Sequence, residues 1–117
     1  MPDSLKKDLS SAHTDREKVY ALTELASYYS GLDDKVSKSY GDQAMEVAEM
    51  SRDRLLIAQT WIRAGNRYFN RASLANSMTQ AMECFQHAEK IARDNDLEDE
   101  LGFSYIGMAR VTRGRGD

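Results

Sequence analysis

The chain has 117 residues, of which 41% are hydrophobic and 30% are charged. This length corresponds to one small domain, and the composition excludes both a disordered chain and a membrane span. The net charge of −3, from 16 basic and 19 acidic residues, argues against a nucleic-acid partner, because phosphate binding needs clustered cations. One cysteine, Cys84, excludes an internal disulfide. No charged start leads into an apolar run, so we expect no secretory signal and a cytoplasmic protein.

The first half of the chain predicts a lead-in helix followed by two longer helices. Residues 3–12 favour the short lead-in helix. Thr14 and Glu17 have the spacing of a capping box, which predicts a helix that begins there and runs to about Ser30. Gly31 is expected to end it, because glycine adopts the left-handed conformation at little cost.

The following helices begin at residues with short polar side chains. Asp33 or Asp34 is expected to cap a helix over about 35–51, and Asp53 another over about 54–71.

The last two helices are also predicted from caps and charge. Ser73, Asn76 or Ser77 is expected to begin a helix that ends near residue 93, and Ser77 and Gln80 match a second capping box. An acidic first turn predicts a final helix over about 99–112. No segment alternates with period two between turn signals, so no sheet is predicted.

An internal repeat relates three of these helices. Each copy has a large apolar or aromatic residue, then an apolar residue, a small residue and, in two copies, a tyrosine. The copies are Leu22-x-x-Leu25-Ala26-x-x-Tyr29, Trp61-x-x-Ala64-Gly65-x-x-Tyr68 and Tyr105-x-x-Met108-Ala109-x-x-Thr112. Between them, Ala81, Phe85 and Ala88 follow the spacing A-x-x-x-F-x-x-A, which Ser37, Gly41 and Ala44 follow more weakly.

These patterns over about residues 15–112 resemble the tetratricopeptide repeat, although the copies are spaced more widely than its usual 34 residues or so. The resemblance implies one all-α domain, 1–117, built of antiparallel hairpins stacked as a short right-handed solenoid with about five main helices. Repeat one would span 15–52 and repeat two 54–93, while 99–112 would be the first helix of a third repeat or a cap. Trp61 would be buried against the helix that carries Ala81, Phe85 and Ala88.

The resemblance also implies a non-enzymatic scaffold that binds a protein or peptide partner in a concave groove lined by the first helix of each hairpin. Carried onto this chain, the groove positions are Tyr20, Thr23, Ser27, Gln59, Ile62, Arg63, Asn66, Phe103, Ile106 and Arg110. The longer repeats resemble tetratricopeptide segments of bacterial signalling proteins. The alternative function is therefore a dimerisation or assembly segment of such a protein.

Other candidate chemistry has a simpler interpretation. Cys84 and His87 offer two zinc ligands where a structural site needs four, so a buried structural cysteine is favoured and no metal or cofactor is expected. No nucleophile and base have the spacing of a catalytic motif, so no enzyme is expected. Arg63, Arg67 and Arg71 form a row that would recognise an acidic peptide or phosphate, or would be a solvated face.

The final predicted helix is apolar around much of its circumference. A terminal solenoid helix needs one polar face, so either the chain is an excised piece of a longer array or a second copy covers the apolar side. The second alternative predicts a homodimer through this helix, with Phe103 and Ile106 near the centre of the contact.

Overall fold

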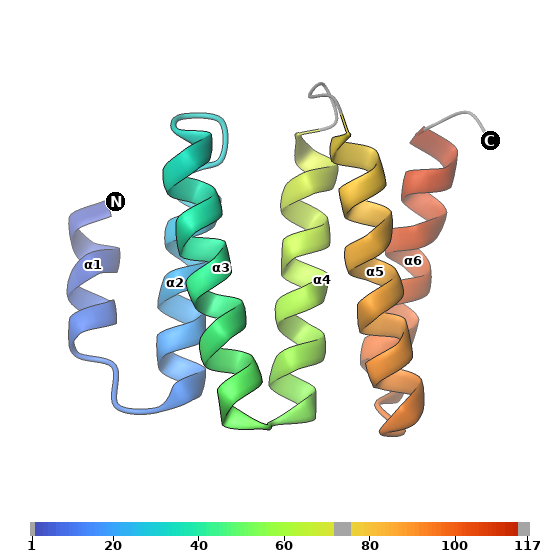
Figure 1. Ribbon diagram of the computed structural model, residues 1–117, viewed down its shortest axis with the longest axis horizontal. Helices are drawn as coiled ribbons and strands as arrows, with labels where there is room; N and C mark the ends of the chain where they lie inside the picture. Colours follow the sequence, from blue (N-terminus) through green and yellow to red (C-terminus); the bar gives the residue numbers. More distant parts are fainter. Residues whose placement is uncertain (1, 72–75, 115–117) are drawn as a thin grey trace. The chain divides into compact units, whose positions relative to one another are not determined.

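The computed structural model describes residues 2–71 and 76–114, and every regular element in them is a helix. Figure 1 shows them in chain order from blue to red. The predicted all-α class is confirmed, and the lead-in helix brings the five expected main helices to six in this part of the chain. They are α1 Pro2–Ser10, α2 Asp15–Tyr29, α3 Asp34–Ser51, α4 Arg54–Asn70, α5 Ser77–Asp94 and α6 Glu98–Gly114.

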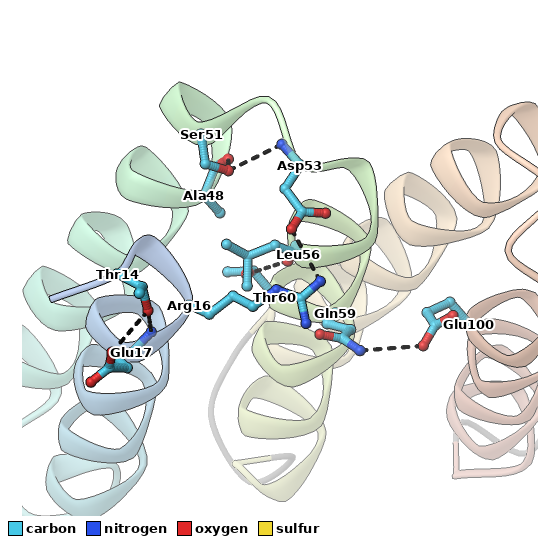
Figure 2. A network of polar contacts seen from close by, with 10 residues as sticks. All are labelled: Thr14, Arg16, Glu17, Ala48, Ser51, Asp53, Leu56, Gln59, Thr60 and Glu100. Atoms are coloured by element: carbon cyan, nitrogen blue, oxygen red, sulfur yellow. Dashed lines mark hydrogen bonds and ion pairs between the residues drawn. The ribbon is translucent and has the colours of Figure 1, made fainter. Parts of the chain in front are cut away.

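Two of the predicted helix caps form as expected. Thr14 Oγ1 accepts a hydrogen bond from the Glu17 backbone N–H at 3.1 Å, and its hydroxyl donates to the Glu17 carboxylate (Figure 2). Asp33 Oδ1 accepts from the Val36 N–H at 3.2 Å and so caps α3. Each bond satisfies a backbone donor that the first helical turn leaves without a partner.

The start of α5 differs from the predicted capping box. Asn76 precedes the helix with a φ of 70°, in the left-handed region that asparagine tolerates, and makes no side-chain cap. The Gln80 N–H donates to the Asn76 carbonyl instead of to a side chain. Ser73, the other candidate start, lies outside the described residues.

The chain divides into two compact units, Met1–Asp53 and Arg54–Asp117, and the division falls between the predicted first and second repeats. In the first unit, α2 packs against both α1 and α3, and α2 and α3 form an antiparallel hairpin (Figure 1). The Ser37 hydroxyl donates to the Ala26 carbonyl at 2.7 Å and links the two helices near their turn. Arg16 pairs with Asp53 at 3.2 Å and links the start of α2 to the end of this unit (Figure 2).

The second unit is a three-helix cluster around one aromatic ring. In it, α5 packs against α4 and α6, and α4 also contacts α6. Phe85 of α5 is 1% exposed and forms the core with Ala81 and Val111. An ideal Cβ on Gly65 of α4 or on Gly107 of α6 would lie 2.8 or 2.4 Å from the Phe85 ring. Both helices therefore approach α5 at a distance that only glycine permits at these positions.

Trp61 is less buried than expected. Trp61 is half-buried, and its ring stacks on that of His87 with 4.4 Å between centroids and 19° between planes. Trp61 contacts α5, as expected, but does so through the exposed His87. The Phe85 ring, and not Trp61, fills the space among the three helices.

The length and polarity of a helix decide whether it could cross a membrane. Within 2–71 and 76–114, none of the helices combines the length and the apolar character that crossing a bilayer requires.

We predict that Gly107→Ala lowers the free energy of unfolding by up to about 2 kcal/mol. Overpacking of a filled core costs about 1–3 kcal/mol, and the better helix propensity of alanine offsets about 1 kcal/mol of this. Urea denaturation followed by circular dichroism measures the change. The control is the same substitution in a Phe85→Leu background, which lacks the ring atoms Cε1 and Cζ and should tolerate the methyl group better. An equal loss in both backgrounds would contradict the ring contact.

Candidate functional site

The seam between α4 and α6 carries most of the predicted groove residues. Gln59 Nε2 of α4 donates to Glu100 Oε2 of α6 at 3.4 Å (Figure 2). Glu100 is only 9% exposed, although it belongs to an otherwise exposed acidic first turn. This polar contact fixes one end of the seam, because a buried carboxylate needs a hydrogen-bond partner.

A second contact fixes the other end of the seam. The Arg110 guanidinium of α6 lies over the Phe69 ring of α4, 4.5 Å from its centroid. A cation over an aromatic face is attracted by the ring quadrupole, by about 0.5–1 kcal/mol at an exposed position. Arg110 is half-buried, so its side chain lies along α4 while part of it stays accessible to solvent.

Two rows of side chains flank this seam. On α4 the row is Gln59, Arg63 and Asn66, spaced by four and three residues, which places them on one face of the helix. On α6 the row is Phe103, Ile106 and Arg110, spaced by three and four. Because Gln59 binds Glu100 and Arg110 covers Phe69, the two rows run beside each other. We call these six residues the α4/α6 surface.

The α4/α6 surface is polar on one helix and largely apolar on the other. The three α4 side chains are half-buried, whereas Phe103 and Ile106 are 55% and 57% exposed. Ile62, also predicted for the groove, packs against the Phe85 cluster and so contributes to the core. The surface therefore offers amide and guanidinium donors beside two exposed apolar side chains.

The three remaining predicted residues lie on α2 of the first unit. Tyr20 and Ser27 are exposed. Thr23 is only 3% exposed, and among the described residues its Oγ1 has no hydrogen-bond partner. Thr60 of α4 is equally buried, but its hydroxyl donates to the Leu56 carbonyl at 2.7 Å (Figure 2). Burial leaves Thr23 unable to present its side chain to a ligand.

We predict that Thr23→Val raises the free energy of unfolding by about 1 kcal/mol, because it replaces a buried hydroxyl without a partner by a methyl group. Thr60→Val is the matched control and should lower it by about 1 kcal/mol, because it removes a satisfied hydroxyl. Thermal denaturation of both variants measures the difference. Destabilisation by Thr23→Val would show that its hydroxyl has a partner after all.

Two residues of the seam were missed by the sequence analysis. Glu100 was interpreted with its acidic neighbours as a charge at a helix N-terminus. Its spacing from Ser104, Gly107 and Val111 places it on the buried face of α6, and this signal would have distinguished it. Phe69 directly follows the repeat position Tyr68, and no sequence pattern marks its contact with Arg110.

Cys84 has the properties of a structural residue. It is buried, and burial raises the pKa of its thiol to about 11, an effect that nearby Glu83 reinforces and Arg67 opposes. His87 is exposed and stacks on Trp61. Among the residues that the structure describes, no three His, Cys, Asp or Glu side chains gather in a way that would hold a metal ion. The Arg63, Arg67 and Arg71 row is half-buried throughout, so it is not a fully solvated face.

We predict that iodoacetamide alkylates Cys84 at pH 8 at least about a hundredfold more slowly in the native protein than in urea, because the thiolate fraction falls with the raised pKa. The same shift links pH to stability. Since the folded pKa of about 11 exceeds the ordinary value of 9.0, the neutral thiol's contribution is complete below pH 9 and is lost as pH rises towards 11. Cys84→Ala is the control and should lack this loss. Equal alkylation rates would contradict burial of the thiol.

Comparison of the chain with protein-family models, with curated proteins and with solved structures gave no match. The chemistry of the α4/α6 surface therefore carries the functional argument.

Proposed function

We propose that this chain is a non-enzymatic protein–protein interaction module that binds an extended peptide segment of a partner along the α4/α6 surface. The observation that carries the proposal is the pairing of two rows beside one seam, one with amide and guanidinium donors and one with exposed Phe103 and Ile106. Donors beside apolar side chains match the two needs of an extended peptide, whose backbone carbonyls need hydrogen bonds and whose side chains need apolar contacts.

We also propose that the chain has the tetratricopeptide architecture, a solenoid in which α2, α4 and α6 are the first helices of successive hairpins. The hairpins α2–α3 and α4–α5 and the α4–α6 contact support this assignment. So does the position of Phe85, which contacts a glycine on its own hairpin partner and another on the helix that follows. Stacked hairpins of this kind would leave the first helices lining one continuous surface.

The charge of the surface favours a peptide with an acidic side chain. Arg63 and Arg110 bring two guanidinium groups to it, and a guanidinium binds carboxylates in a bidentate fork. The Glu100 carboxylate accepts a hydrogen bond from Gln59, and the two arginines outnumber this one negative charge. The partner segment would pair one acidic residue with these arginines and place an apolar residue against Phe103.

We predict that Arg63→Ala and Asn66→Ala each weaken peptide binding by about tenfold, because each removes a donor from the surface. A random dodecapeptide library panned against the wild-type protein supplies the ligands, and isothermal titration calorimetry measures their affinities. Arg54→Ala, at an exposed position in the first turn of α4, is the matched control and should bind normally. Thermal denaturation should show all three variants folded.

Acidic peptides should dominate the selected sequences, and their affinity should fall as salt rises, because charge pairs near a surface are screened. A library that yields no binders, or binders indifferent to both substitutions, would contradict the proposal.

The alternative function is a dimerisation or assembly segment, such as those of bacterial signalling proteins. The observation in its favour is the apolar exposure of α6, where Phe103, Tyr105 and Ile106 are each about half exposed.

A further inference from the structure

One face of α6 is exposed along its whole length. It consists of Asp99, Gly102, Ile106, Ala109 and Arg113, all of which are exposed. Their spacing alternates between three and four residues, as in the contact seam of paired helices. The opposite face, which includes Glu100, Ser104, Gly107 and Val111, is the one that packs within the unit. We call the exposed set the outer face of α6.

Gly102 on the outer face has no role in packing among the residues that the structure describes. A Cβ added there would meet nothing within 4 Å, whereas one added at Gly65 or Gly107 would meet the Phe85 ring. Glycine in a helix interior is less favourable than alanine, so a position that the fold leaves open gains nothing from it. A glycine at an open position permits the close approach of a backbone from outside, where a missing side chain is useful.

The charges on the outer face of one copy are complementary to those of a second, antiparallel copy. Asp99 and Arg113 lie at opposite ends of the face, two helical turns before and after Ile106. When two copies of α6 run antiparallel about a two-fold axis at Ile106, Asp99 of each copy meets Arg113 of the other. Parallel copies would instead place like charges together.

We propose that α6 binds a second copy of this chain through its outer face, as an antiparallel helix pair on a two-fold axis at Ile106. Gly102 and Ala109 lie one turn on either side of Ile106, and their small side chains leave room for the partner's isoleucine. Phe103 flanks the contact. A two-fold contact is the commonest closed arrangement of identical chains. Tyr105 lies to one side, where its hydroxyl accepts from Arg93 of α5 at 2.9 Å.

Ile106 and Phe103 belong to the α4/α6 surface as well, so a second copy and a peptide would compete for these two side chains. The two tests remain distinguishable, because the deciding residues of the dimer are Asp99, Gly102 and Arg113, none of which belongs to the α4/α6 surface. Failure of the peptide experiment leaves the dimer untouched, and a monomer leaves the α4 donors untouched.

Sedimentation equilibrium of the full chain tests the proposed dimer with variants in which the charge at one end of the outer face is reversed. The wild type should dimerise, and Asp99→Arg and Arg113→Asp should each raise the dimer dissociation constant at least about tenfold, because each places like charges at both ends of the pair. An equimolar mixture of the two variants should recover the dimer, since each then meets its opposite. Glu46→Arg makes the same charge change at an exposed position of α3 and is the control.

Gly102→Leu tests whether the two α6 helices approach each other closely at this glycine. It should keep the helical circular dichroism of the wild type, because the position is open within the chain, and it should abolish the dimer. A wild type that stays monomeric up to about 1 mM overturns the proposal, since contacts weaker than that are not specific association. A dimer indifferent to Gly102→Leu, or one indifferent to both charge substitutions, also overturns it.

Discussion

The second unit depends on the contact of the Phe85 ring with two glycines. Phe85 is almost completely buried, and it lies against Gly65 on one side and Gly107 on the other. A large ring with a small residue on each side lets three helices meet at native packing density without a cavity. The ring supplies the buried apolar area, and the glycines set how closely α4 and α6 approach it.

The α4–α6 seam follows from this contact. Because both helices are drawn towards one ring on α5, they lie against each other, and polar groups along their meeting line need partners. Gln59 supplies one for Glu100, and Phe69 supplies a surface for Arg110. The rows that flank the seam are thus held by the core beneath them. Binding surfaces on such rigid supports lose little entropy when a ligand binds.

The glycines of α6 differ in what surrounds them among the described residues. Gly107 is required within the chain by the Phe85 ring, whereas Gly102 faces open space. Two glycines five residues apart on one helix therefore point to two different helix contacts, one within the unit and one that we assign to a second copy. Exposure alone would not make this distinction, because isolated exposed apolar residues are common on protein surfaces.

The sequence by itself determined the helices, because capping residues and apolar periodicity act over a few neighbouring positions. Thr14 and Asp33 cap as predicted, and the helices expected over about 54–71 and from about Ser77 coincide with α4 and α5. Only the tertiary structure decided which predicted site residues share a surface. It brought Gln59, Arg63 and Asn66 beside Phe103, Ile106 and Arg110, and it buried Thr23. It also left Trp61 half-buried and stacked on the exposed His87. Such outcomes depend on which side chain fills a shared volume, and that competition involves residues far apart in the chain.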